Sequence, residues 1–532
     1  MTAATTTSSE RGAWTPLAYT LFRWLWIASI ASNVGTWMQN VGAAWLMTSL
    51  SPSPLQVALV QTATNLPIFL LGVPAGAFAD LFDRRKVLLV TQAWMLGAAA
   101  VLGALTLAHE TGPWMLLLLT FSLGLGATMN GPAWQAILPE LVPRSEMPAA
   151  IALNSVGFNL ARAVGPALGG LVVSAVSPGA AFLLNAVSFM GVIMVLYLWP
   201  RKPDMVPSHP ESVGSAILAG FRYVRFAPEM HSVLMRSGVF IISASALWSI
   251  LPLVAKVELH SESSGYGVLL GCLGVGSILG AIVLNPLRRK VSNDALVTYA
   301  IALFGWVNIA LAYLDNFYVV AAALLLGGMA WMTVNSTLNT VAQTSLPGWV
   351  RARALGVYLL VFQGAMALGS VLWGWIATRF GLRAALLMAG ITLLGGALLT
   401  AQLRFASAKE LDTTPSQHWP EPQFAVEPKP EQGPVLVTIE YAIDNADAPA
   451  FAGAMEAVER IRRRGGAMQW GLFEDAARPG RFIESFMVES WAEHLRQHER
   501  STMTDRRQEE KAVAFHRGDG LPAVTHWLAA GN

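Results

Sequence analysis

The sequence predicts an all-α membrane protein that crosses the bilayer many times and carries a small α+β domain at its C-terminus. Of the 532 residues, 54% are hydrophobic and only 13% are charged, about half the charged fraction of an ordinary soluble protein. Apolar runs of about 20 residues, the length that spans a hydrocarbon core about 30 Å thick, recur between residues 17 and 403. Because lipid offers the backbone no hydrogen-bond partner, we expect each run to be a helix.

The apolar runs predict twelve transmembrane helices in two sets of six. A short cytoplasmic segment, 1–16, precedes the first half, 17–199, whose helices are expected at 20–48, 56–79, 87–108, 113–137, 148–175 and 180–199. A polar cytoplasmic loop, 200–231, leads to the second half, 232–404, whose helices are expected at 232–256, 265–286, 293–313, 317–341, 352–377 and 383–403.

The two halves repeat each other at a constant offset of 204 residues. Gly76 recurs as Gly280, and Arg84 recurs as Arg288. The same offset relates three further pairs, which are Gly124 and Gly328, Gly165 and Gly369, and Gly170 and Gly374. Duplicated halves that bind a small molecule near the bilayer midplane are typical of secondary transporters.

The distribution of positive charge predicts the orientation, because Lys and Arg are retained on the cytoplasmic side of short loops. They lie in alternate connections, at Arg84, Arg85, Lys86, Arg144, Arg201, Lys202, Arg288, Arg289, Lys290, Arg351 and Arg353. The opposite connections hold Lys256, Arg379 and Arg383. With an even number of spans, we expect both termini in the cytoplasm.

Charge and cysteine content exclude several classes of function. The formal net charge of +2 is too small, and the basic residues too scattered, to indicate a nucleic-acid partner. A single cysteine, Cys272, lies inside an apolar run and cannot form a disulfide within the chain or a cysteine metal cluster. We therefore expect the lipid bilayer and a small molecule as partners, and no cofactor.

A glycine, an aspartate and a basic cluster follow one another at the end of the second apolar run, at Gly76, Asp80, Arg84 and Arg85. This string resembles the loop signature of the major facilitator superfamily, although Leu81 and Asp83 replace its usual arginine and glycine. We expect the glycine to allow close helix approach. Asp80 is expected to hold a facing helix N-terminus or a basic side chain as part of a cytoplasmic gate. The alternative is that the basic residues only set the topology.

The fifth apolar run contains Gly165, Pro166, Gly169 and Gly170, which resemble the signature of the exporter branch of the superfamily. Small residues let helices pack closely, and a proline favours a bend. The motif therefore suits a packed gate between the halves. A tight helix contact with no bearing on direction is the alternative.

Polar side chains within the apolar runs are candidates for a substrate pathway. A charged side chain in hydrocarbon is costly and normally has a partner or faces a water-filled cavity, which singles out Arg162. Amides in transmembrane helices often bond neighbouring helices, but with aromatic residues they also form walls that suit an amphipathic ligand. The candidates are Arg162, Asn33, Trp37, Gln39, Asn40, Asn130, Trp134, Asn159, Asn335 and Gln363.

Further strings resemble the bacterial transmembrane secretion effector branch of this superfamily, among them Ser32-Asn33-x-Gly35-x-Trp37 and Asn159-x-Ala-Arg162-x-x-Gly165-Pro166. The resemblance covers about residues 15–405. It implies the major facilitator fold, a bacterial inner membrane, and alternating-access export of a small amphipathic compound such as a siderophore or drug, as in the enterobactin exporter family. An importer is the alternative. The arginine of proton-coupled exporters is Thr120 here, and every Asp and Glu of 17–403 lies in or beside an expected loop, so the coupling ion stays open.

A polar linker, 405–434, and a compact cytoplasmic α+β domain, 435–532, are expected after the last apolar run. Alternating patterns predict strands, and helical patterns predict two helices. The strands are expected at 435–443, 467–474, 481–488 and 522–528, and the helices at 448–464 and 491–515.

The string Trp491-x-Glu-His494-Leu-Arg-Gln-His498-Glu-Arg500 resembles the tail of the same branch. The order of elements resembles the ferredoxin-like, dimeric α+β barrel of antibiotic-biosynthesis monooxygenases, which implies dimerisation through this domain. A membrane-anchored oxidoreductase is one hypothesis, but we favour an assembly or regulatory module and no enzyme. His494 and His498 lie one helical turn apart, as a metal-binding pair would, yet their polar neighbours favour a solvated face and no metal.

Overall fold

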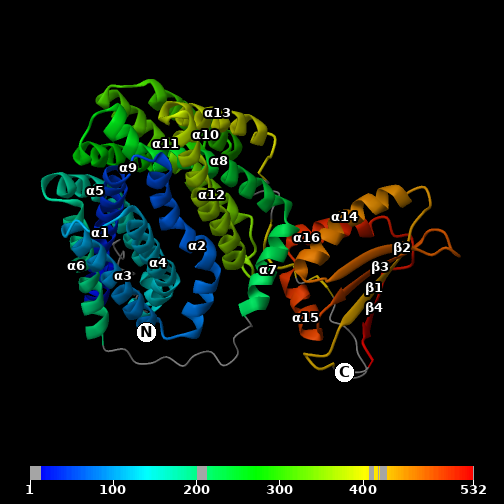
Figure 1. Cartoon of the computed structure of the whole chain (residues 1–532). Helices are drawn as coiled ribbons and strands as arrows, with labels where there is room; N and C mark the ends of the chain where they lie inside the picture. Colours follow the sequence, from blue (N-terminus) through cyan, green and yellow to red (C-terminus); the bar gives the residue numbers. More distant parts are fainter. Residues whose placement is uncertain (1–13, 200–212, 406–411, 417, 420–427, 531–532) are drawn as a thin grey trace, which may run out of the picture. The chain divides into compact units, whose positions relative to one another are not determined.

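The computed structural model describes residues 14–199, 213–405, 412–416, 418–419 and 428–530 (Figure 1). The chain divides into two compact units. The first unit comprises Met1–Ser208, Arg236–Leu338 and Leu359–Gln402, and the second comprises His209–Met235, Asn339–Tyr358 and Leu403–Asn532. The second unit therefore includes segments from the middle of the chain as well as the tail.

Six long helices make up the first half, each within a few residues of its expected position. They are α1 (Thr20–Leu50), α2 (Pro54–Leu81), α3 (Arg84–Leu107), α4 (Pro113–Leu141), α5 (Met147–Ala175) and α6 (Pro178–Leu198). Proline lies in the first turn of α2, α4, α5 and α6, where its missing N–H costs no hydrogen bond. Asp83 caps α3 and Ser177 caps α6 by accepting the N–H groups of Lys86 and Ala180.

The second half repeats this pattern. Its helices are α8 (Pro228–Leu253), α9 (Ser263–Arg288), α10 (Asn293–Tyr313), α11 (Phe317–Thr344), α12 (Arg351–Phe380) and α13 (Leu382–Thr400). A π-helical turn, η3 (Val254–Glu258), extends α8. The connection between α12 and α13 is a single residue, Gly381, whose φ of +89° favours glycine.

Eleven of the described helices are long and apolar enough to cross a membrane. Large hydrophobic side chains such as Trp94, Leu118 and Val187 are exposed on them, as expected of a surface that faces lipid. The remaining long helix, α1, carries three amides, Asn33, Gln39 and Asn40, among its apolar residues. Twelve transmembrane helices therefore stay a prediction, with α1 as the twelfth.

Equivalent glycines pack equivalent helix pairs in the two halves. A Cβ added at Gly124 of α4 would contact α2, and one added at Gly328 of α11 would contact α9. Likewise, Gly165 of α5 packs against α1, and Gly369 of α12 packs against α8. The offset of 204 residues thus relates packing partners as well as residue types, which supports a duplicated half.

The polar connection between the halves contains a helix that the sequence analysis did not expect. Residues 213–225 form α7 (Val213–Arg225), whereas residues 200–212 lie outside the described part of the chain. Tyr223 of α7 is buried, and the Arg222 guanidinium lies 3.3 Å from the Glu493 carboxylate in the second unit. The helix therefore packs with the tail instead of forming an open loop.

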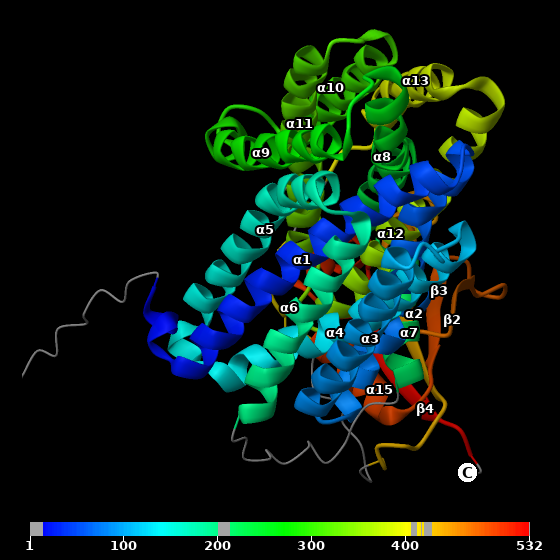
Figure 2. The same ribbon diagram turned by 60° about the vertical axis from the view of Figure 1, so that its left-hand side comes forward.

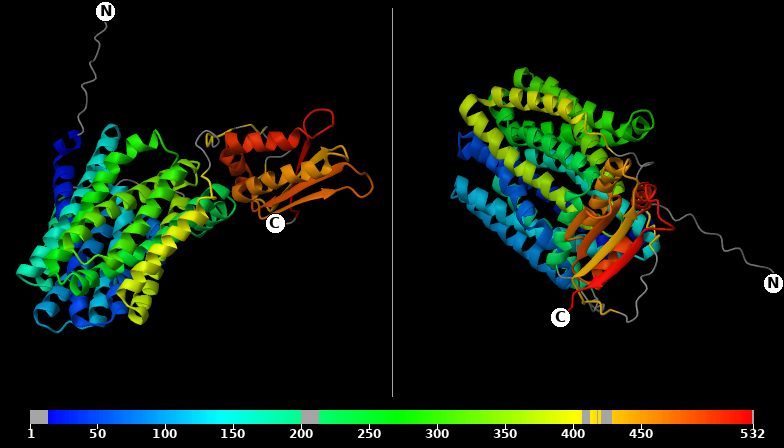
Figure 3. Two further views of the ribbon diagram at one scale, coloured as in Figure 1. Left: turned by 90° about the horizontal axis from the view of Figure 1, so that it is seen from above. Right: turned by 90° about the vertical axis from the view of Figure 1, so that its right-hand side faces the viewer.

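The tail folds into a four-stranded antiparallel sheet with helices on one face (Figure 3). The strands are β1 (Val435–Ala442), β2 (Gln469–Glu474), β3 (Arg481–Val488) and β4 (Ala523–Leu528), in the order β2-β3-β1-β4, and the helices are α14 (Ala448–Gly465), α15 (Trp491–Arg500) and α16 (Met503–Val513). Alternate residues of β1 and β3 are buried, including Val437, Phe482 and Phe486.

Two expectations for the tail are corrected. The helix expected at 491–515 is two helices, because Thr502 caps α16 in a reciprocal capping box with Asp505. Part of the expected linker is also ordered against the domain. The Ser416 N–H donates to the Ser501 carbonyl, and the Met503 N–H donates to the Thr414 carbonyl.

Candidate functional site

A large polar cavity lies within the first half, between α1, α3, α4, α5 and α6. Its empty volume is about 1530 Å³. Four of the expected pathway residues line it, namely Asn33, Asn130, Trp134 and Asn159. Ser29, Ser32, Gln92, Gln135, Asn154 and Ser155 add hydroxyl and amide groups, and Leu138, Met147, Ile151 and Phe158 add apolar surface. We call this the amide cavity.

The amides of Gln92 and Asn130 form the ordered polar centre of the amide cavity. Gln92 Nε2 donates to Asn130 Oδ1 at 3.2 Å, and the Thr91 hydroxyl lies 3.1 Å from the same oxygen. Gln92 is only 3% exposed, and its Oε1 is buried without a hydrogen-bond partner among the described residues. A buried acceptor left unpaired costs about 1–3 kcal/mol, which makes Gln92 Oε1 the polar atom of this cavity most in need of a partner.

A second cavity, of about 800 Å³ of empty volume, lies between the two halves. The expected residues Trp37 and Asn40 of α1 line it, together with Trp248 of α8 and Tyr266 of α9. Aromatic rings from both halves therefore meet around one space, as midplane binding between repeats requires.

Arg162 lies on α5 with its guanidinium 5.9 Å from the centre of the Trp248 ring. Its Nε is buried and has no hydrogen-bond partner among the described residues. The contact is a cation–π pair between a first-half helix and a second-half helix. Because Trp248 lines the second cavity, which we call the inter-half cavity, this pair links Arg162 to the wall of that cavity.

The other three expected pathway residues bond within or between helices, or are buried. Gln39 accepts from Asn185 Nδ2 of α6. Asn335 Nδ2 donates to the Trp331 carbonyl one turn earlier in α11, and Gln363 is buried in α12. None of these three lines either cavity.

The glycines of the fifth helix pack it against both halves. A Cβ at Gly165 would lie 2.6 Å from the Trp37 Cβ, and one at Gly169 would lie 2.7 Å from the Met38 Cα, both on α1. A Cβ at Gly170 would lie 2.6 Å from the Ser263 carbonyl oxygen at the start of α9. Only residues without side chains allow such an approach.

Gly170 belongs to a seam where α5 and α9 lie side by side (Figure 2). On the α9 side, a Cβ at Gly267 would lie 2.7 Å from the Pro166 carbonyl oxygen. Further along, one at Gly274 would lie 3.0 Å from the Ala163 Cα. The two halves are therefore in backbone contact along this seam.

The expected gate motif makes other contacts than the sequence indicates. Arg84 donates to the Ala136 carbonyl at 3.1 Å and to Glu140 at 3.2 Å, and Arg85 donates to the carbonyls at the end of α6. The Asp80 side chain lies outside the described residues. A Cβ added at Gly76 would meet no atom of the described residues within 4 Å, so close helix approach at this glycine stays a prediction.

The histidine pair of the tail is not on a solvated face, which corrects the expectation from its polar neighbours. His494 is fully buried, and its Nε2 lies 3.3 Å from His498 Nε2. Burial and the charge of neighbouring histidines, His526 among them, lower the pKa of His494 to about 3 and that of His498 to about 4. Across the described residues, no three His, Cys, Asp or Glu side chains are grouped to hold a metal ion.

The sequence analysis missed Gln92, the residue with the clearest unsatisfied group in the amide cavity. A signal was present, since Gln92 is the single amide in an otherwise apolar run at 87–108. An amide in such a run must face a helix or a cavity instead of lipid. Asn154 of α5 lines the amide cavity as well.

Duplicated helical halves, a cavity between them and an amide-lined cavity in one half define a polytopic transporter of the major facilitator type. A family model described as "Transmembrane secretion effector" matches residues 11–532. The chain belongs to that family. It is accordingly a multi-pass inner-membrane transporter and not an enzyme.

Curated relatives are similar over most of the chain. The staphyloferrin A transporter of Staphylococcus aureus is 21% identical over 361 residues, 68% of this chain and 90% of its own length. The multidrug efflux pump Tap of Mycolicibacterium fortuitum is 25% identical over 400 residues, 73% and 95% of the two chains. The enterobactin exporter EntS of Salmonella typhi is 25% identical over 363 residues, 66% and 84%.

Solved structures confirm the transporter fold. An inward-facing bacterial homologue of the human lysosomal transporter Spinster matches 74% of this chain and 97% of its own, with a TM-score of 0.58 and 15% identity. An inward-facing bacterial homologue of the iron transporter ferroportin matches 71% and 98%, with a TM-score of 0.53 and 17% identity.

Proposed function

We propose that this protein exports a small amphipathic compound, such as a siderophore or drug, by alternating access. The amide cavity carries the proposal. Its hydroxyl and amide groups lie beside Trp134, Leu138 and Phe158, so one wall suits the polar part of a ligand and another its apolar part. The unpaired Gln92 Oε1 supplies an acceptor for a ligand N–H or O–H.

Export is the direction that the relatives favour, because two of them are named as an efflux pump and an exporter. The exporter motif supports it as well. Gly165 and Gly169 hold α5 against α1, and Gly170 lets α5 meet α9. A seam built from backbone contacts closes fully or opens fully, as a gate must.

The charge pattern orients this seam. The Gly170–Ser263 end of the seam adjoins connections poor in Lys and Arg, whereas α4 and α5 meet at the basic connection around Arg144. We assign the seam to the extracellular side and the amide cavity to the cytoplasmic side. Twelve transmembrane helices, with α1 counted, put both termini in the cytoplasm, and the cavity then faces the compartment from which an exporter loads.

Among the described residues, the lining of the two cavities offers no carboxylate for proton coupling. Arg162 is the charged group beside the inter-half cavity, and we assign it to ligand binding or gating through Trp248.

We assign the tail, 435–532, to the ferredoxin-like, dimeric α+β barrel type and to an assembly or regulatory role. The element order with sheet order β2-β3-β1-β4 supports this type. The uncovered face of the sheet carries Phe473 and Trp527, which are 61% and 57% exposed. A second copy's sheet would cover such aromatic side chains. The transporter relatives do not favour the oxidoreductase alternative.

Dye accumulation in cells that lack their own efflux pumps tests the proposal. We expect the wild-type chain to lower intracellular ethidium, an amphipathic dye. Gln92→Leu and Asn130→Leu should abolish most of that effect at equal expression, because each removes a cavity hydrogen bond worth about 1 kcal/mol. The matched control is Gln343→Leu, an exposed amide outside both cavities.

The outcomes separate the two parts of the proposal. No effect of the wild-type chain on any amphipathic dye tested would overturn export. Export by the wild type that Gln92→Leu and Asn130→Leu leave unchanged would overturn the assignment of the amide cavity.

A further inference from the structure

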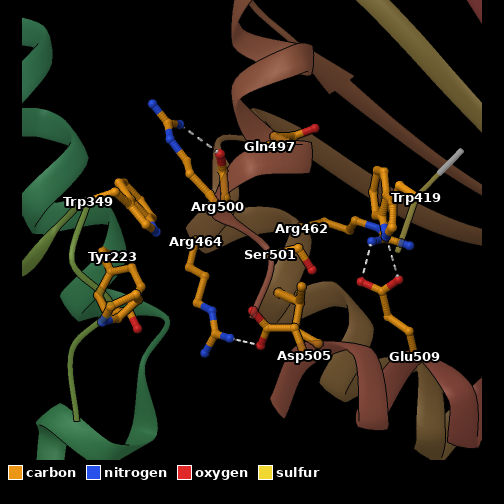
Figure 4. A pocket seen from close by; sticks show the side chains of 13 residues that line it. Tyr223, Trp349, Trp419, Arg462, Arg464, Gln497, Arg500, Ser501, Asp505 and Glu509 are labelled. Carbon is orange, nitrogen blue, oxygen red and sulfur yellow. Dashed lines mark hydrogen bonds and ion pairs between the residues drawn. The ribbon is translucent and has the colours of Figure 1, made fainter. Parts of the chain in front are cut away.

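The space among Tyr223, Trp349 and Trp419 in the second unit is too small for an organic ligand (Figure 4). It amounts to about 20 Å³, the room that about one water molecule needs. Arg500 covers the Trp349 ring, with its guanidinium 4.5 Å from the ring centre. Arg462 covers the Trp419 ring at the same distance. Ligand-sized space outside the two cavities lies instead on the first half.

An apolar groove lies on the outer surface of the first half, between α2, α3 and α4. Its volume is about 420 Å³, within the range of small-molecule sites. Phe78 and Phe82 of α2 form one wall, with their ring centres 4.3 Å apart. Trp94 of α3 lines the end away from the first turn of that helix, and its Nε1 donates to the Ser122 carbonyl of α4 at 2.9 Å. We call this the α2–α4 groove.

The α2–α4 groove opens toward lipid. Val90 and Trp94 are 68% and 55% exposed, on a helix that is long and apolar enough to cross a membrane, so hydrocarbon surrounds them. Lys86 and Trp94 line the two ends of the groove on α3 and lie about 12 Å apart along the helix axis. Half of the hydrocarbon core is about 15 Å thick. The groove is therefore long enough to hold most of one acyl chain within a single leaflet.

The first turn of α3, at one end of the α2–α4 groove, carries positive charge that the described carboxylates do not balance. Arg84 is paired with Glu140. Asp83 caps the helix by accepting the Lys86 N–H, so the helix N-terminus offsets its charge. Arg85 donates to two carbonyls at the end of α6, and the exposed Lys86 ammonium bonds to no described residue. Two cations without a described carboxylate partner favour an anionic group at this end.

The duplication of the chain separates the charge of the α2–α4 groove from its aromatic walls. At the offset of 204 residues, Lys86 corresponds to Lys290, which is also exposed. The same offset relates Phe82 to Pro286 and Trp94 to Thr298. The two halves therefore share the lysine, but the aromatic rings belong to the first half. Lys290 offers a matched control, because it has the same charge without the apolar walls beside it.

We propose that the α2–α4 groove binds an anionic phospholipid of the cytoplasmic leaflet. One acyl chain lies against Phe78, Phe82 and Trp94, and the Lys86 ammonium pairs with the phosphate. The charge pattern that orients the chain puts the first turn of α3 at the cytoplasmic headgroups, where anionic lipids attract lysine side chains. The groove shares no described lining residue with either cavity, and its lipid does not depend on export.

Native mass spectrometry of the full-length protein in detergent tests the proposal, because it measures the affinity of the first bound lipid separately from later ones. The probes are dioleoylphosphatidylglycerol, which is anionic, and dioleoylphosphatidylcholine, which has the same acyl chains and no net charge. Lys86→Gln removes the charge at the groove, and Lys290→Gln is its control. Val90→Trp fills part of the groove, and its control is Val101→Trp, on the same helix outside the groove. All four side chains are exposed, so none of the changes disturbs a core.

We expect the first phosphatidylglycerol to bind more tightly than the first phosphatidylcholine. Lys86→Gln should weaken the binding of phosphatidylglycerol about fivefold, the effect of one lysine near anionic lipid, and Lys290→Gln should leave it unchanged. Val90→Trp should weaken the binding of both lipids about tenfold, as the loss of about two buried methylene groups implies. Val101→Trp should have no such effect.

Four results would each overturn the proposal. They are equal affinities for the two lipids, equal effects of the two lysine substitutions, equal effects of the two valine substitutions, and saturable binding of glycerol 3-phosphate. Glycerol 3-phosphate carries the phosphate without acyl chains, so its binding would indicate a site for free phosphate compounds instead of a lipid site.

Discussion

Gly170→Ala adds a single methyl group and should hinder closure of the α5–α9 seam. The added Cβ would lie 2.6 Å from the Ser263 carbonyl oxygen and 2.9 Å from the Gly267 Cα. Carbon contacts are optimal at about 3.5–4.0 Å, so the two backbones must separate. Overpacking of this kind costs about 1–3 kcal/mol, which lowers the population of the closed seam about 5- to 150-fold relative to the open seam.

Two spin labels measure this shift directly. The single native cysteine is first replaced by Cys272→Ser, and labels are attached through Val176→Cys and Val257→Cys, two exposed positions at the seam's end. We expect longer label distances in Gly170→Ala, together with reduced dye export. The control is Gly97→Ala on α3, where a Cβ meets nothing within 4 Å and alanine favours the helix. If Gly170→Ala and Gly97→Ala give the same distances between the spin labels and the same rate of dye export, the seam is not a gate.

Three further predictions concern the buried charges and histidines. Arg462→Ala leaves the fully buried Glu484 without its charge partner and should destabilise the second unit by about 3–5 kcal/mol. Denaturant-dependent hydrogen exchange of the β1 and β3 amides measures this loss of stability. Exchange rates equal to those of the wild type would contradict the prediction. The pKa values of His494 and His498 are about 3 and about 4, below the unfolded value of about 6.5. Their contribution to stability is therefore complete above about pH 6.5 and is lost as the pH falls toward 4, because the unfolded chain binds protons first. Hydrogen exchange of the β1 amides, corrected for intrinsic exchange rates, measures this loss. Protection factors that stay constant from pH 7 to 4.5 would disprove it. Arg162→Ala should lower export at normal expression, since it removes the contact with Trp248, and unchanged export would exclude a functional role for Arg162.

The long helices were predictable because bilayer thickness fixes their length and lipid fixes their backbone hydrogen bonding. α10 (Asn293–Tyr313) has the expected bounds. α7 was missed because its neighbours are polar and it is shorter than a membrane span. Its buried face belongs to the second unit, which composition alone does not reveal.

The tail shows how local signals can be overlooked. Thr502 and Asp505 form a capping box that marks a new helix, and this pair is visible in the sequence. His494 was placed on a solvated face because charged residues surround it along the chain. On a helix, however, it shares a face with Trp491 and Gln497, and both are buried with it.

The sequence indicated which residue types would line the candidate pathway, but it did not indicate which side chain or cavity each of them would contact. Asn33 and Asn130 line the amide cavity, whereas Gln39 is bonded to Asn185 of α6. Amide residues in membrane helices serve either role. Which role each one takes depends on neighbouring helices that the local sequence does not specify.

Transport into everted inner-membrane vesicles tests the central claim, export of an amphipathic compound through the amide cavity, most directly. In such vesicles the cytoplasmic face is outside, so an exporter accumulates ethidium in the lumen once the membrane is energised. We expect accumulation with the wild-type chain and at least a fivefold lower rate with Gln92→Leu, the reduction that one lost hydrogen bond implies. Equal rates for the two chains, or no accumulation above empty vesicles, would contradict the claim.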